Sequence, residues 1–241
     1  MKKDNVPLTI PIYGLLLIIL LASCARSSDH DYKNIPSRGM PEHVKGSFSR
    51  DIEKYTKLIE NDQQNAEAYF RRGSLYMAEG LDKEALSDLN RAIELDPKHK
   101  TAYNNRGVLY TTQKRYDEAI NDFTHALEIL PNPADYRNRA SAYFYKKEYD
   151  KAIEDYNNAL KLFPKDTLAF FWRGEAYYSK GLYDNAIADY TKVIEIDPTN
   201  ATAYHHRGKS YERKGLLALA DADYVQACKI TTYFCPQSKW K

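Results

Sequence analysis

The chain has 241 residues, with 35 lysines and arginines against 33 aspartates and glutamates, so its net charge is only +2. Such a balanced charge lacks the basic footprint of a nucleic-acid-binding protein. The sequence contains no HExxH motif, no glycine-rich phosphate loop and no CxxC pair, and its six histidines are scattered. It therefore predicts a protein without enzymatic activity, cofactor or metal.

Residues 1–23 predict an export signal. Two lysines follow the initiator methionine, and the apolar run at 10–21 has the length of a signal core but is short for a membrane span. The sequence LASC that ends at Cys24 resembles a bacterial lipobox. This resemblance implies that Cys24 is lipidated and becomes the first mature residue. An ordinary export signal followed by a chance cysteine is the alternative.

The predicted lipid anchor places the protein in the bacterial cell envelope. Ala25 is not the aspartate that retains lipoproteins on the inner membrane of enteric bacteria, so we expect the outer membrane, facing the periplasm. A cell-surface location is the alternative. Residues 24–46 are polar and interrupted by prolines and glycines, which predicts a flexible tether behind the lipidated cysteine. About 20 such residues reach on the order of 25 Å.

Residues 47–65 predict a single capping helix. Phe48, Ile52, Tyr55 and Ile59 have helical spacing and align with the second half of the repeats described next. A lone helix of this kind would cover the open apolar face of the first repeat, and repeat arrays need such caps.

Residues 66–234 contain five copies of one pattern. Its most regular member is an alanine that recurs at intervals of 34, 33, 34 and 34 residues. Each copy holds two stretches of small and aromatic residues spaced 4, 3 and 4 apart, which predicts a pair of helices. Glycines in three copies mark the break between them, and prolines close the second helix in four. The predicted repeats are 66–99, 100–133, 134–166, 167–200 and 201–234.

This pattern resembles the tetratricopeptide repeat (TPR) family. The resemblance is carried by the period, an aromatic–Gly–Tyr triplet (Tyr69, Gly73 and Tyr76 in the first copy), two alanines and the closing proline. It implies an all-α fold, a right-handed solenoid of five helix-turn-helix repeats plus the capping helix. The chain as a whole looks like a bacterial TPR lipoprotein.

The resemblance also implies a protein-binding groove on the concave side, lined by the first helix of each repeat. The aligned positions in this chain are Phe70, Met77, Asn104, Arg137, Tyr145, Phe171, Glu175, Tyr178, His205, Lys209 and Arg213. Members of the family that bind chaperones use a lysine and asparagine clamp for a C-terminal carboxylate. Its asparagine positions read Ser74, Val108 and Ser141 here, so a ligand of that kind is not expected.

An arginine on the first helix and an aspartate on the second occur in every copy. In an antiparallel helix pair these two positions lie at a similar height, so the side chains should meet. A partly buried arginine needs such a partner, and its planar fork suits a carboxylate. We therefore predict structural ion pairs, within one repeat or between neighbours, formed by Arg72, Arg106, Arg139, Arg173 and Arg207 with Asp88, Asp122, Asp155, Asp189 and Asp223.

The C-terminal end has two further cysteines, Cys228 and Cys235. An oxidising periplasm permits a disulfide between them, and two unpaired thiols are the alternative. No full capping helix follows the fifth repeat. Either the tail at 235–241 caps it, or the open end docks a partner or a second copy, which would form a homodimer.

These observations favour a non-enzymatic adaptor of the envelope that holds partner proteins or peptides in its groove. The alternative is an assembly factor, similar to a pilotin, for an outer-membrane secretin, a pilus or a related machine.

Overall fold

The computed structural model describes residues 48–235. The predicted signal peptide, the lipidation site Cys24, the tether and the end of the tail lie outside these residues. The described part contains eleven α-helices, one 3-10 helix and no strand, and none of its helices is long and apolar enough to cross a membrane. The helices are α2 (Ser49–Asn61), α3 (Ala66–Glu79), α4 (Asp82–Leu95), α5 (Lys100–Thr112), α6 (Tyr116–Ile129), α7 (Pro133–Tyr145), α8 (Tyr149–Leu162), α9 (Thr167–Ser179), α10 (Tyr183–Ile196), α11 (Ala201–Arg213), α12 (Leu217–Ile230) and the 3-10 helix η1 (Thr232–Phe234).

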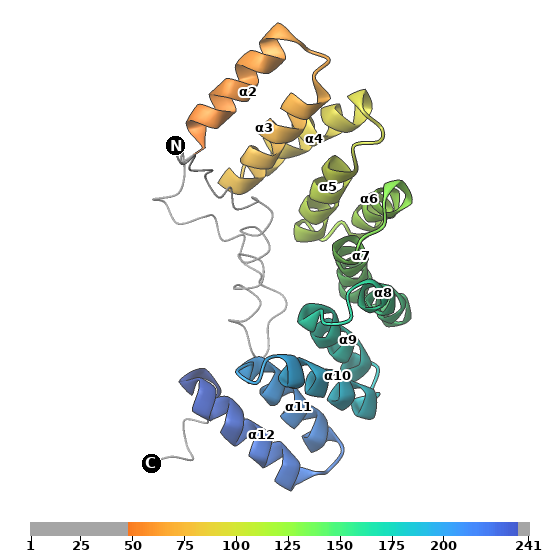
Figure 1. Ribbon diagram of the computed structural model, residues 1–241, viewed down its shortest axis with the longest axis vertical. Coiled ribbons are helices and arrows are strands. Elements are labelled where there is room, and N and C mark those ends of the chain that lie inside the picture. The colour runs from red at the N-terminus through yellow and green to blue at the C-terminus, as the bar shows by residue number, and fades with distance from the viewer. Residues whose placement is uncertain (1–47, 236–241) are drawn as a thin grey trace, which may run out of the picture.

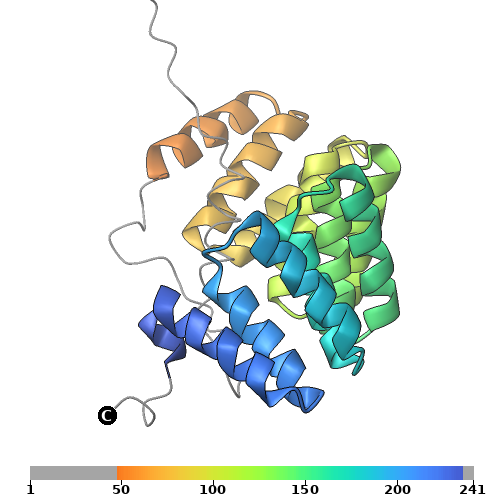
Figure 2. The ribbon, with the colours of Figure 1, turned by 60° about the horizontal axis from the view of Figure 1, so that its bottom comes forward.

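The ten helices from α3 to α12 form five pairs, one in each predicted repeat, and each second helix packs on the first helix of the next repeat. The array is an all-α TPR-type solenoid that bends into an arc, with α2 at one end and α12 at the other (Figure 1). Figure 2 shows both ends on the same side of the middle repeats. The single helix α2 packs against α3, where a preceding repeat would stand.

Caps and turns set the boundaries of the helices. Every first helix starts at a residue whose side chain accepts a hydrogen bond from the first turn; in α3, for example, Asn65 accepts from the amide of Ala68. The turn inside each repeat requires one residue in the left-handed region. Gly80, Gly181 and Gly215 fill it in three repeats, with φ of 74°, 77° and 76°. Lys114 and Lys147 adopt the same conformation in the other two, with φ of 61° and 67°.

The core of each repeat lies between its two helices. The recurring alanine of the second helix is fully buried in the first four copies and 2% exposed in the fifth. A small residue on the first helix lies opposite a large residue on the second helix and lets the two helices approach closely. A Cβ added to Gly174 would lie 2.8 Å from the ring of Tyr190. The sequence therefore specifies close packing within the repeat by pairing small residues with large ones.

Candidate functional site

The five arginine–aspartate pairs lie within single repeats. Arg72 donates from Nε and Nη2 to the two carboxylate oxygens of Asp88, at 2.7 and 2.9 Å. The same forked contact joins Arg139 to Asp155 at 2.7 and 2.8 Å. The other pairs repeat this geometry: Arg106 with Asp122, Arg173 with Asp189 and Arg207 with Asp223.

Each arginine also reaches the preceding repeat, or the capping helix α2 in the case of Arg72, and the ion-pair pattern alone does not predict this contact. The free Nη1 of Arg139 donates to the Thr124 hydroxyl at 3.0 Å, and that of Arg72 donates to Thr56 on α2 at 3.2 Å. A threonine or asparagine two residues after the aspartate is the signal that could have revealed this contact. The remaining acceptors are Asn90, Asn157 and Thr191.

In four of the five repeats, two aromatic rings lie beside the guanidinium of the paired arginine. The rings of Tyr69 and Tyr76 both lie with centroids 5.8 Å from Cζ of Arg72. The environment is dry enough that burial raises the pKa of Asp155 and of Asp189, and the hydrogen bonds from the paired arginines offset this only in part. These pairs hold neighbouring helices together and leave no free cation for a ligand, so their role is structural.

The first helices form the inner surface of the arc. Helix α3 contacts α5, α5 contacts α7, and α7 contacts α9, in addition to the contacts within each repeat. Of the predicted groove residues, Arg213 is exposed and most of the others are half-buried; these are Met77, Asn104, Arg137, Tyr145, Phe171, Tyr178, His205 and Lys209.

The prediction that they line the groove is wrong for two residues, Phe70 and Glu175. Phe70 is only 2% exposed, because it packs in a core with Leu89 and the ring of His99, which caps α5, lies 4.5 Å away. Glu175 is 7% exposed and accepts hydrogen bonds from inside the protein. Alignment with the family gives the side of the helix on which a residue stands, but the neighbouring repeat decides its depth.

Glu175 is the centre of a buried link between the fourth and fifth repeats. Its carboxylate contacts Nδ1 of His206 on α11 and accepts the hydroxyl hydrogen of Tyr190 on α10. Burial acts to raise the pKa of Glu175, but the charge and hydrogen bond of His206, together with the Tyr190 bond, outweigh it and lower the pKa. Burial and the adjacent carboxylate raise the pKa of Tyr190 well above its usual range.

Polar contacts also occupy the inner side of the third repeat. Asn104 donates to Asp135, which Lys100 approaches at 2.7 Å, and Arg137 pairs with Asp166. Asp166 at the same time caps α9 through the amides of its first turn. Asn104 and Arg137 thus join repeats as well as lining the inner surface.

Aromatic rings form a continuous series from the start of α6 across α7, α9 and α11 to η1, which we call the aromatic ladder. Successive ring contacts run from Tyr116 to the C-terminal end, with centroid distances of 4.7 to 6.2 Å. Trp172, at its middle, was missed because its position in the other copies holds arginine, asparagine or histidine. In order, the ladder comprises Tyr116, Tyr145, Trp172, Phe171, His206, His205 and Phe234.

A second group of rings and cations lies beside the ladder. Tyr178 and Tyr183 meet edge to face at 5.4 Å. Lys209 lies 5.9 Å from the centroid of the Tyr178 ring, and the guanidinium of Arg213 lies 5.4 Å from that of Tyr183. The fourth and fifth repeats therefore present aromatic and basic groups together.

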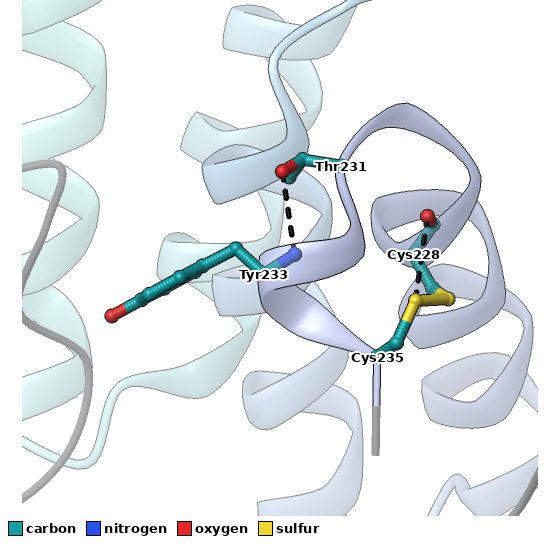
Figure 3. The surroundings of a disulfide bond; sticks show 4 residues. All are labelled: Cys228, Thr231, Tyr233 and Cys235. Carbon is teal, nitrogen blue, oxygen red and sulfur yellow. Dashed lines mark hydrogen bonds between the residues drawn. A yellow bond between two sulfur atoms is a disulfide. The ribbon is translucent and has the colours of Figure 1, made fainter. Parts of the chain in front are cut away.

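The C-terminal segment closes the ladder. Cys228 and Cys235 form a disulfide with a Cα–Cα distance of 4.7 Å, and Thr231 caps the short helix η1 by accepting from the amide of Tyr233 (Figure 3). The disulfide keeps Phe234 next to α12, and the ring of Phe234 stacks on His205 with centroids 4.7 Å apart. Among residues 48–235 no group of three or more potential metal ligands occurs.

Comparisons with known proteins agree with this architecture. A family profile described as tetratricopeptide repeat matches residues 66–99 and 101–133, a second of the same description matches 201–232, and one described as TPR repeat matches 140–181 and 174–215. No curated protein matches the chain.

Several solved structures share the fold. The crystal structure of YrrB, described as a TPR protein with an unusual peptide-binding site, is 27% identical, with a TM-score of 0.66 over 75% of this chain and 94% of that one. A MamA protein is 25% identical, with a TM-score of 0.65 over 68% and 91%. The C-terminal part of a TPR repeat-containing protein from Cytophaga hutchinsonii is 19% identical, with a TM-score of 0.68 over 76% and 74%, and shows the fold alone. With its five helix pairs and these matches, the chain belongs to the tetratricopeptide repeat family, whose repeats form scaffolds for protein–protein interaction.

Proposed function

We propose that this chain is a non-enzymatic lipoprotein of the bacterial envelope that binds partner proteins or peptides on the inner surface of its third to fifth repeats. The observation that carries the proposal is the aromatic ladder. Tyr145, Phe171 and Trp172 are half-buried on helices α7 and α9, so part of each large side chain stays accessible to a partner. Aromatic residues and arginines dominate binding energy in protein interfaces.

Basic side chains beside these rings would form a polar rim around the proposed binding surface. Lys209 and Arg213 lie on α11 one helical turn apart, beside Tyr178. A partner would thus meet an apolar centre on the third and fourth repeats and a basic edge on the fifth. The YrrB structure, similar over most of this chain, is described as having a peptide-binding site, which fits the same class of ligand.

Affinity capture from solubilised envelopes tests the binding proposal. The full chain serves as bait beside Tyr145→Glu and Tyr178→Glu, with Tyr145→Phe and Tyr178→Phe as matched controls that keep the ring. We expect the glutamate variants to lose a partner that the phenylalanine variants retain. The loss of one such anchor costs about 2 kcal/mol or more, close to thirtyfold in affinity.

Circular dichroism separates lost binding from lost folding. If the helicity of a glutamate variant falls, its ring belongs to the core between repeats and not to the binding surface. If every bait captures the same proteins, the inner surface is not where partners bind. Capture of a wall hydrolase or a protease would support an adaptor, whereas a secretin or pilus component would favour the assembly factor.

The lipid anchor is proposed from the sequence around Cys24. Several acyl chains on one cysteine anchor a protein stably, whereas a single chain does so only marginally. We expect Cys24→Ser to release the protein from the membrane fraction of the native organism. Unchanged fractionation of this variant would overturn the lipoprotein assignment without affecting the binding proposal.

A further inference from the structure

The second helices carry a recurring set of groups that receive the following repeat. In repeats two to four an aspartate in the first turn pairs with a lysine at the end of the next repeat's first helix, as Asp117 does with Lys146 at 2.7 Å. The other two pairs are Asp150 with Lys180 and Asp184 with Lys214. The threonine or asparagine that accepts from the next repeat's arginine is the second such group.

Helix α12 departs from this set at three positions. Ala218 stands where the aspartates stand, and Val225 replaces the threonine or asparagine acceptor. Asp221 takes the place of an aliphatic residue, which is leucine or isoleucine in all four preceding repeats. Polar groups have become apolar and an apolar group has become charged. The face of α12 that would receive another repeat therefore has a different pattern of polar and apolar residues from the same face of the other second helices. We call it the respecified face.

Helix α12 lies at the end of the arc (Figure 1), and the residues of this face are exposed. Ala218, Ala222 and Val225 lie along its middle, and all three are exposed. Asp221 precedes Val225 by four residues and Lys229 follows it by four, so the two charges flank the apolar centre on one side of the helix. Leu217 and Leu219, 61% and 48% exposed, widen the apolar area at the start of the helix.

We propose that this face binds a second copy of the chain, with α12 packed antiparallel on α12 around a two-fold axis at Val225. An antiparallel copy exchanges positions 221 and 229, so each Asp221 meets a Lys229 of the other chain and two opposite-charge contacts form. Ala218 and Ala222 permit close approach of the helices. Such a self-complementary patch is what a two-fold dimer requires.

A charge swap tests the geometry on the purified full chain, with its mass measured by light scattering in detergent. We expect the wild type to dimerise as its concentration rises. Asp221→Lys and Lys229→Asp should each lose the dimer, because they oppose like charges twice. The double variant should regain it, and a mixture of the two single variants should form a heterodimer. Val225→Glu should also be monomeric.

Glu84→Lys, an exposed charge reversal on α4, is the matched control and should dimerise like the wild type. Two results would overturn the proposal. One is a wild type that stays monomeric at every concentration. This includes the case in which dimers form only after deletion of residues 236–241, because those residues would then be what covers the face. The other is dimerisation of the single charge variants at wild-type strength.

Discussion

At the scale of the residue, the recurring arginine–aspartate pair combines a strong local interaction with a large desolvation cost. The side chain of Asp155 is 4% exposed and that of Arg139 is 19% exposed. Burial raises the pKa of Asp155 despite its partner. A buried ion pair of this kind contributes little net stability compared with an apolar pair, but it is costly to break from one side.

A double-mutant cycle at this pair should show that asymmetry. Arg139→Met and Asp155→Ala should each lower the free energy of unfolding by about 3 kcal/mol or more, because each leaves a buried charge without its partner. The double variant should cost less than the two single changes added together, by a coupling energy of about 2 kcal/mol. Urea unfolding of the wild type, the two single variants and the double variant measures the four free energies of unfolding. Additive losses would show that the pair is not coupled.

The partner of each arginine could be predicted from sequence, but not the complete contact. Antiparallel helices bring the two positions to the same height, so the aspartate was the expected partner. Whether it came from the same repeat depended on the angle between repeats, which composition does not encode. The errors at Phe70 and Glu175 have the same origin. Their depth is set by His99, the residue that caps α5, and by His206 on α11, and no single-repeat pattern shows these contacts with the following helix pair.

At the scale of the element, the five helix pairs could be predicted because small, aromatic and proline residues recur with helical spacing. The turns could be predicted only in part. Three contain glycine, whereas Lys114 and Lys147 occupy the same left-handed position without any sequence signal of it. A lysine there carries a steric cost of about 1–2 kcal/mol that glycine avoids.

Substitution at these two turns should therefore stabilise the protein. Lys114→Gly and Lys147→Gly should each raise the free energy of unfolding by about 0.5–1 kcal/mol, since relief of strain exceeds the added flexibility of the unfolded chain. The reciprocal change Gly181→Lys should lower it by a similar amount. Thermal melts of the three variants measure the effect. A lower melting temperature for both glycine variants would show that lysine makes compensating contacts.

At the scale of the whole molecule, the array is close to one-dimensional, because each repeat contacts only its neighbours. Damage at one end should remain local. The disulfide closes a loop from Cys228 to Cys235, for which chain entropy gives about 2–3 kcal/mol.

Cys228→Ser with Cys235→Ser should release η1 and destabilise the last repeat. Hydrogen exchange should speed up in α12, while α3 to α8 keep their protection. Treatment of the wild type with a reductant should reproduce the change, and the double serine variant should not respond to it. An equal loss of protection along the entire chain would show that the repeats unfold as one unit.

The reach of each arginine into the preceding repeat also determines how such a chain can change in length. Every junction from α2 to α11 uses the same donor and the same kind of acceptor, so an internal repeat duplicated in the gene would find both partners already in place. A repeat appended after α12 would meet Val225, which offers its arginine no acceptor. Duplication of an internal repeat therefore keeps this hydrogen bond at every junction, whereas a repeat added after α12 loses it.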